Sequence, residues 1–298
     1  MFLNISFYKF FHLQKSQLKK YKEKLLTSAK SLEIKGLFIL STEGLNASFC
    51  GPVESVKSFK EICQKIFNQE FFYKDSLSKI KAFKRFSVKI KKEIISLGQT
   101  YKTQQKNGHL SPQEWELKLQ KKAQILDVRN NYEIRLGHFE TASHLNMENF
   151  QEFPQKIEKS FLNKEKETLI YCTGGIRCEK AIEVMKNKGF KKVYQLEGGI
   201  LNYLKYFPHS HFKKDCFIFD HRVALDQNLK VSRNYSLCPH CGQAGDLKIK
   251  CQHCSAPCVI CSFCEKKFSH YKTCSKNCAY HFKKGHLSKK KNKISALT

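Results

Sequence analysis

The sequence lacks both a long hydrophobic run and a secretory signal. No stretch of this 298-residue chain approaches the roughly 18 consecutive apolar residues that a membrane-spanning helix needs. The segment Met1–Lys15 is apolar, but it has no basic n-region and no small-residue cleavage site, which argues against secretion. We therefore expect a cytoplasmic protein without membrane contact, whose first element is a β-strand.

Acidic residues are scarce. The chain has 26 Asp and Glu against 54 Lys and Arg, a formal net charge of +28. A surface of this charge attracts polyanions, most commonly a nucleic-acid backbone. A general lysine bias explains part of the excess, because Lys is spread along the whole chain. However, the stretch from Glu265 to Thr298 holds ten Lys and a single acid, and a basic tail after a Cys-rich segment favours nucleic acid as partner.

Residues 1–100 predict a ferredoxin-like α+β domain. Strands are expected at Phe2–Phe10, from Ile34, at Ala47–Gly51 and, as the closing strand, from Arg85, with helices at Gln14–Leu32 and Val53–Phe67. The order β-α-β-β-α-β is typical of this fold. The polar stretch Tyr101–His109 reads as a linker.

Residues 110–212 predict an α/β domain with a parallel sheet, because buried strands alternate with helices. Ser111, Pro112 and Glu114 match the first positions of a helix, and Trp115 is expected in the core. Further strands are expected at Ala123–Arg129, Thr168–Cys172 and Lys192–Gly199, and helices at Phe150–Phe161, Arg177–Lys188 and Ile200–Tyr206. A third, Cys-rich segment covers residues 213–298.

A reactive cysteine is predicted at Cys172. An apolar strand leads into it, Gly174 and Gly175 allow a tight loop, and a helix begins at about Arg177. Backbone N–H groups at a helix N-terminus, with the Arg177 charge, would stabilise an anionic sulfur, either a thiolate or a persulfide. The alternative is a buried structural cysteine, which the glycines and the arginine disfavour. The other loop residues are Thr173 and Ile176.

The loop C-T-G-G-I-R, Cys172–Arg177, resembles the active-site loop of the rhodanese domain. The segment Leu126–Phe139 resembles the rhodanese stretch that carries D-V-R and G-H-I. Thr141 departs from the pattern, because rhodaneses usually have glycine there. The C-x4-R spacing is one residue shorter than the C-x5-R loop of cysteine phosphatases, and a shorter loop suits a sulfur atom better than a phosphate.

Several further motifs are similar, in order, to the rhodanese-related tRNA uridine hydroxylase family, TrhO, over nearly all of residues 1–254. They are E-G-L-N at Glu43–Asn46, G-H-L-S-P-Q-E-W at Gly108–Trp115, C-T-G-G-I-R-C-E-K-A at Cys172–Ala181, L-E-G-G-I-L-N-Y at Leu196–Tyr203 and C-F-I-F-D-H-R-V-A at Cys216–Ala224. The resemblance implies O₂-dependent hydroxylation of carbon 5 of the wobble uridine, with the anticodon region of tRNA as partner.

The resemblance also implies a cysteine persulfide intermediate on Cys172. Cys178 matches a family cysteine and either exchanges with sulfur on Cys172 or packs within its helix. The residues explain a reactive sulfur, but they do not explain oxygen insertion. The sequence has no G-x-G-x-x-G fingerprint of a nucleotide cofactor, no two-His, one-carboxylate iron site, and nothing that identifies the electron donor.

The Cys-rich segment predicts one or two structural zinc sites. Two C-x2-C pairs separated by nine residues can close an all-thiolate tetrahedral site, and two further pairs follow. Sequential pairing and cross-bracing, in which the first and third pairs share an ion, are both allowed. Disulfides are disfavoured in a reducing compartment. The expected ligands are Cys238, Cys241, Cys251, Cys254, Cys261, Cys264, Cys274 and Cys278.

Two other functions compete with tRNA hydroxylation. The first is a rhodanese-type sulfurtransferase that carries a persulfide to an acceptor. The second is a non-catalytic zinc protein that binds RNA and retains a rhodanese fold without its chemistry. Dependence on tRNA and O₂ separates the hydroxylase from both.

Overall fold

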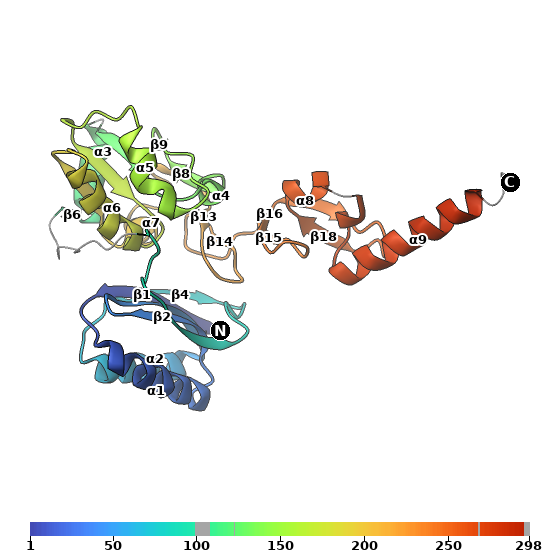
Figure 1. The fold of residues 1–298 in the computed structure, drawn as a ribbon, viewed down its shortest axis with the longest axis horizontal. Coiled ribbons are helices and arrows are strands. Elements are labelled where there is room, and N and C mark those ends of the chain that lie inside the picture. The colour runs from blue at the N-terminus through green and yellow to red at the C-terminus, as the bar shows by residue number, and fades with distance from the viewer. Residues whose placement is uncertain (99–107, 122, 268, 295–298) are drawn as a thin grey trace. The chain divides into compact units, whose positions relative to one another are not determined.

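The computed structural model describes residues 1–98, 108–121, 123–267 and 269–294, so most of the expected linker lies outside the described residues. The chain forms two compact units, Met1–Val231 and Ser232–Thr298 (Figure 1). Among the described residues, no helix is both long and apolar enough to cross a bilayer.

The N-terminal domain has the expected ferredoxin-like fold with one added strand. Its elements are β1 (Phe2–Phe10), η1 (Lys15–Gln17), α1 (Leu18–Ser31), β2 (Lys35–Ser41), β3 (Gly44–Gly51), α2 (Val53–Phe67), β4 (Lys74–Ser78) and β5 (Phe86–Ile90). The sheet order is β4-β1-β3-β2-β5. Every pairing is antiparallel except β2 with β5.

The segment after Arg85 forms a strand, but the prediction that it is the closing strand of the ferredoxin-like fold is wrong. The fourth strand of the fold is β4, which pairs with β1, whereas the segment after Arg85 forms β5 at the opposite edge, parallel to β2. Sequence reasoning missed β4 because its five residues, K-D-S-L-S, include one apolar side chain, Leu77, and that side chain is exposed. A short edge strand of this kind carries no hydrophobic alternation.

The two faces of this sheet differ in chemistry. Phe7, Phe38 and Phe49 are fully buried on one face, which α1 and α2 cover (Figure 1). Because successive strand residues point to opposite faces, the polar residues Ser6 and Tyr8 lie on the other face. That polar face lines the cavity described below.

The rhodanese-like domain has the parallel sheet that the sequence predicts. Its elements are β6 (His109–Leu110), α3 (Pro112–Gln120), β7 (Gln124–Asp127), α4 (Asn131–Ile134), β8 (Gly137–Phe139), β9 (Ser143–His144), η2 (Phe150–Glu152), α5 (Phe153–Glu158), β10 (Thr168–Tyr171), α6 (Ile176–Asn187), β11 (Val193–Leu196) and α7 (Gly199–Tyr206). The order is β6-β11-β10-β7-β9, all parallel. Ser111 and Glu114 form a reciprocal capping box at α3, and Trp115 is fully buried.

The stretch after residue 212 continues the first unit. Strand β12 (Phe212–Lys214) pairs with β8, and β13 (Cys216–Phe217) pairs with β14 (Ala224–Leu225). Cys216 packs in the same core as Trp115. The compact division therefore falls after Val231, later than the start expected for the third segment at residue 213.

The second unit is small and Cys-rich. Its elements are β15 (Ser236–Leu237), β16 (Ala244–Gly245), β17 (Leu247–Lys250), β18 (Pro257–Ile260), α8 (Ser262–Lys267), η3 (Ser269–Tyr271) and α9 (Lys276–Ile294). Two antiparallel hairpins, β15–β16 and β17–β18, precede the helices. Among its described residues, the hydrophobic cluster consists of Cys238, Ile260, Cys261 and Cys264 with three partly buried neighbours. Such a cluster is too small to hold the fold without a further constraint.

Candidate active site and metal centres

Cys172 lies between the end of β10 and the start of α6, as the sequence predicts, and its sulfur accepts the Gly175 N–H at 3.1 Å. Gly175 has φ +97°, and a Cβ there would lie 2.8 Å from the Tyr8 hydroxyl oxygen. Gly199, at the start of α7, has φ +68°, and a Cβ there would lie 2.4 Å from the Cys172 carbonyl oxygen. Both positions therefore require glycine.

The loop stabilises a thiolate on Cys172. Burial opposes ionisation, but a hydrogen bond from the Cys178 thiol, the charge of Arg177 and the N–H groups of Arg177 and Cys178 lower the pKa of Cys172 to about 5. Burial and the neighbouring Cys172 sulfur raise the pKa of Cys178 well above its usual value. Cys178 is therefore a protonated donor to the Cys172 thiolate, and both side chains are fully buried.

Arg177 is fixed by a carboxylate that sequence reasoning did not assign to the site. Its guanidinium makes a bidentate pair with Glu133, with N–O distances of 2.5 and 2.6 Å. Glu133 is fully buried and also accepts the Asn130 N–H and, more weakly, the Thr173 hydroxyl. Glu133 lies within the D-V-R-N-N-Y-E stretch, so the matched motif was the signal that could have identified it.

A cavity of about 630 Å³ opens onto Cys172. The loop residues Thr173, Gly174, Ile176 and Arg177 line it from the rhodanese side, and the polar face of the N-terminal sheet lines it from the other. Tyr132 and the 60% exposed ring of Phe219 also lie at its wall. The cavity is thus large enough for a nucleotide and combines aromatic rings with polar groups.

Two sets of polar contacts hold the N-terminal domain against the loop helix α6. The Tyr8 hydroxyl donates to Glu179 at 2.8 Å. The next residue, Lys180, is fully buried and pairs with Glu43 at 3.0 Å and with Glu93 at 2.6 Å. Glu43 belongs to the E-G-L-N turn and Lys180 to the C-E-K segment, so this ion pair joins two of the motifs recognised in the sequence.

Lys74 was not predicted as a site residue, because no pattern in β4 marks it. It belongs to the N-terminal domain, lines the same cavity as Cys172 and is 6% exposed. Its side chain reaches the loop itself, since a Cβ at Gly174 would lie 3.4 Å from the Lys74 Cε.

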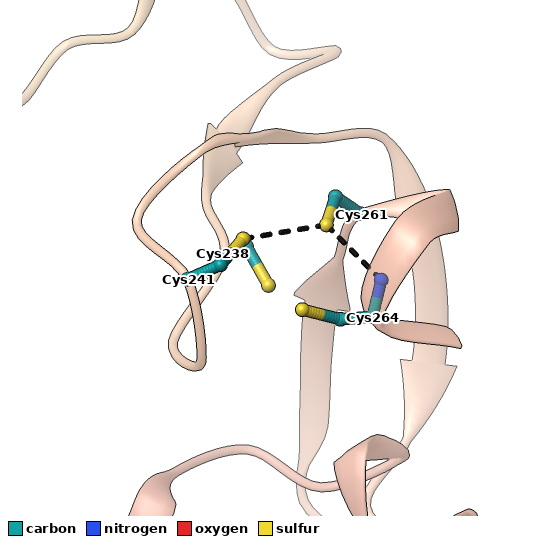
Figure 2. A group of neighbouring side chains, drawn as sticks. All are labelled: Cys238, Cys241, Cys261 and Cys264. Carbon is teal, nitrogen blue, oxygen red and sulfur yellow. Dashed lines mark hydrogen bonds between the residues drawn. The ribbon is translucent and has the colours of Figure 1, made fainter. Parts of the chain in front are cut away.

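The eight predicted metal ligands form two groups in the second unit. Cys238, Cys241, Cys261 and Cys264 make one group (Figure 2). Cys251, Cys254, Cys274 and Cys278 make the other. The four sulfur atoms of each group lie within 4.8 Å of one another. Of the two pairings that the sequence left open, the structure therefore has the cross-braced one, and the sequential one is wrong.

Both groups fit a tetrahedral zinc ion. Zinc–sulfur bonds of about 2.3 Å place pairs of thiolate sulfurs about 3.8 Å apart. The sulfur atoms of Cys241 and Cys261 lie 3.5 Å apart, and those of Cys254 and Cys278 lie 3.8 Å apart. The Cys264 N–H also points at the Cys261 sulfur at 3.4 Å, as in thiolate metal sites. Cys258 belongs to neither group.

Three family models match consecutive parts of the chain. They are the UPF0176 acylphosphatase like domain over residues 2–94, the Rhodanese-like domain over residues 111–206 and the Rhodanase C-terminal model over residues 213–279. Their order agrees with the ferredoxin-like domain, the Cys172 domain and the Cys-rich segment.

Curated relatives match almost the whole length. A tRNA uridine(34) hydroxylase of Bdellovibrio bacteriovorus is 43% identical over 285 residues, which is 94% of this chain and 81% of the relative. Proteins of the same name from Prochlorococcus marinus and Legionella pneumophila are 34% and 39% identical over 89% and 78% of this chain, and over 89% and 93% of their own lengths. The chain therefore belongs to the tRNA uridine(34) hydroxylase family.

Proposed function

We propose that this protein hydroxylates carbon 5 of uridine 34 in tRNA. The observation that carries the proposal is the 43% identity to a tRNA uridine(34) hydroxylase across 94% of the chain, which covers both domains that line the Cys172 cavity. In the reaction, the C5–H bond becomes C5–OH. One atom of O₂ enters the base, and two electrons and two protons from a reductant convert the other into water.

Cys172 is the reactive group of this proposal. Its low pKa provides an anionic sulfur at neutral pH, and the loop N–H groups can hold either a thiolate or a persulfide. Arg177 is positioned by Glu133 and contributes charge to the loop. Because the cavity can hold one nucleotide but not a duplex, uridine 34 must enter it unstacked from the anticodon loop.

The second unit serves RNA binding in this proposal. Two zinc ions hold its small core, and a reducing cytoplasm keeps the ligands as thiolates. The unit has 13 Lys and Arg against two acids, a charge balance that suits contact with tRNA phosphates.

Nucleoside mass spectrometry of tRNA tests this function. A strain that has no other route to 5-hydroxyuridine would be deleted for this protein and complemented with the intact chain or with Cys172→Ser. We expect 5-hydroxyuridine-type nucleosides to vanish on deletion and to return only with the intact chain. If they persist in the deletion strain, the proposed function is wrong.

Sulfur transfer is the second candidate, and the Cys172 loop favours it. A thiolate with a pKa of about 5 in a loop of N–H groups is also what a persulfide carrier needs. Thiosulfate-to-cyanide transfer by the purified protein would measure it. Rapid turnover without tRNA, together with unchanged tRNA nucleosides in the deletion strain, would favour this candidate over hydroxylation.

A further inference from the structure

Lys74 is a buried lysine whose ammonium has no polar partner among the described residues. Its side chain is 6% exposed, and its contacts are with the rings of Tyr8 at 5.0 Å and Phe72 at 5.4 Å from the nitrogen. Lys180 is also buried, but its ammonium is paired in the usual way, with two carboxylates and the Ile95 carbonyl oxygen. Burying an unpaired ammonium costs free energy, so Lys74 has a cost that its local packing does not offset.

The surroundings of Lys74 explain what its charge can act on. Cys172 and Glu179 favour the protonated form, Glu197 does so more weakly, and Lys205 opposes it. Glu179 is already engaged by Tyr8, His109 and Gln195, and Lys205 pairs with Asp75 at 3.2 Å. Glu197 is exposed to solvent, so the Cys172 sulfur is the buried anionic group near Lys74 that has no ion pair among the described residues.

We propose that Lys74 is a positioning residue of the active site, contributed by the N-terminal domain, whose ammonium holds the anionic sulfur of Cys172 in the cavity. The expected effect of Lys74 on turnover rests on the proposed function. Its expected effect on the ionisation of Cys172 does not depend on that function. This role of Lys74 gives the N-terminal domain a chemical part in the site, since β4 delivers a second positive charge beside that of Arg177, whose guanidinium is already paired with Glu133.

The position of Lys74 supports this role in two ways. Its Cε approaches the loop at Gly174, where the absence of a side chain leaves room for it. Burial lowers the pKa of Lys74 to about 8, so its ammonium is charged at neutral pH and becomes neutral in mildly alkaline solution. An exposed lysine would keep its charge to higher pH.

The test compares three variants of the full chain. Lys74→Met removes the charge and keeps the length, and Lys74→Arg keeps the charge. Lys89→Met removes an exposed lysine of β5 outside the cavity and controls for net charge. The readout is the pH dependence of iodoacetamide labelling of the Cys172 peptide, measured by mass spectrometry. Melting temperature and uridine hydroxylation on tRNA are measured beside it.

We expect Lys74→Met to move the labelling midpoint of Cys172 upward by about one pH unit, the effect of losing a nearby opposite charge. Lys74→Arg and Lys89→Met should leave the midpoint near that of the intact protein. Lys74→Met should keep a melting temperature close to that of the intact protein, because methionine fills the space of the lysine stem and removes the cost of burying the ammonium. Its hydroxylation rate at saturating tRNA should fall about tenfold or more while half-saturation changes less than about twofold.

An unchanged labelling midpoint of Cys172 in Lys74→Met would overturn the proposal. The proposal would also be wrong if Lys74→Met had a lower melting temperature and Lys74→Arg showed the same shift of the labelling midpoint, because both results would indicate that Lys74 acts through packing alone. If the labelling midpoint shifts in Lys74→Met but the intact protein does not modify tRNA, the Lys74 proposal stands and the proposed function is wrong. The two failures are thus distinguishable.

Discussion

The chemistry that we propose depends on a few buried polar residues around one sulfur atom. Cys172 receives N–H groups, the Cys178 thiol and the charge of Arg177, and Arg177 is in turn held by Glu133. Each of these groups is nearly or fully buried, so none is screened by water. Removing one of these groups should therefore lower the free energy of unfolding more than a surface substitution does.

Glu133→Gln is expected to destabilise the first unit strongly. The variant leaves Arg177 buried beside an amide that cannot neutralise it, at a cost of about 3–5 kcal/mol. Urea unfolding followed by the fluorescence of Trp115 measures this. Glu54→Gln is the control, because Glu54 pairs with Lys57 on the surface and should cost less than about 1 kcal/mol. Equal effects of the two substitutions would contradict a buried, structural pair at Arg177.

Variants of Cys178 separate its two possible roles. The labelling midpoint of Cys172 in the intact protein should lie at about pH 5, because a lowered pKa keeps the thiolate until the pH falls to that value. Cys178→Ala removes a donor and should raise the midpoint, whereas Cys178→Ser keeps a donor and should preserve it. If Cys178 instead exchanges with sulfur on Cys172, both variants should lose turnover, whether or not the labelling midpoint of Cys172 changes.

Residue chemistry was predictable from the sequence where neighbouring residues encode it. Cys172, the two loop glycines and the start of the helix lie within ten residues, so local spacing was sufficient. Glu133 reaches the site from a distant segment of the same domain, and the packing of the N-terminal domain brings Tyr8 and Lys74 to it. No periodicity or spacing along the chain carries that information.

Helices and strands were also predictable where a local pattern marks them and were missed where only distant contacts define them. Helices with a clear apolar stripe, such as Val53–Phe67, were predicted to the residue. Strand β4 was missed because its side chains are mostly polar and its partner, β1, lies some 70 residues away. In the Cys-rich unit, spacing identified the ligand pairs but could not choose between two pairings with the same spacing. The hairpin β17–β18 carries the third pair back to the first.

Double substitutions test the cross-braced pairing through metal content. Cys241→Ala with Cys261→Ala removes two ligands of one group, so one zinc per chain should remain. Cys241→Ala with Cys251→Ala damages both groups and should leave none. Sequential pairing would reverse these two results. Elemental analysis of the purified proteins gives the count, and Cys258→Ala should keep two zinc ions because Cys258 is not a ligand.

At the scale of the whole molecule, charge is the dominant feature. A net charge of +28 produces a long-range attraction for RNA, while the site itself relies on short-range contacts inside the cavity. We therefore assign affinity for tRNA mainly to lysines outside the cavity, above all those of the C-terminal tail, and reaction chemistry to the Cys172 cavity. The charge was readable from composition alone, because it depends on no fold.

Affinity for tRNA should fall steeply with salt. Counterion release predicts a loss of more than about tenfold between 50 and 200 mM salt if three or more phosphates are contacted. Fluorescence anisotropy with labelled tRNA measures it. Replacing four tail lysines by Gln should flatten the salt dependence more than replacing four exposed lysines near α1. The tail set is Lys289, Lys290, Lys291 and Lys293, and the control set is Lys15, Lys19, Lys20 and Lys24. Equal flattening would contradict a tRNA-binding tail.

The most direct test of the whole account is the origin of the oxygen atom at uridine 34. The deletion strain, complemented with the intact chain or with Cys172→Ser, would be grown briefly under ¹⁸O₂, and tRNA nucleosides would be analysed by mass spectrometry. We expect heavy oxygen in the 5-hydroxyuridine made by the intact chain and no 5-hydroxyuridine with Cys172→Ser. Light oxygen in that nucleoside, or its formation by the serine variant, would contradict the account.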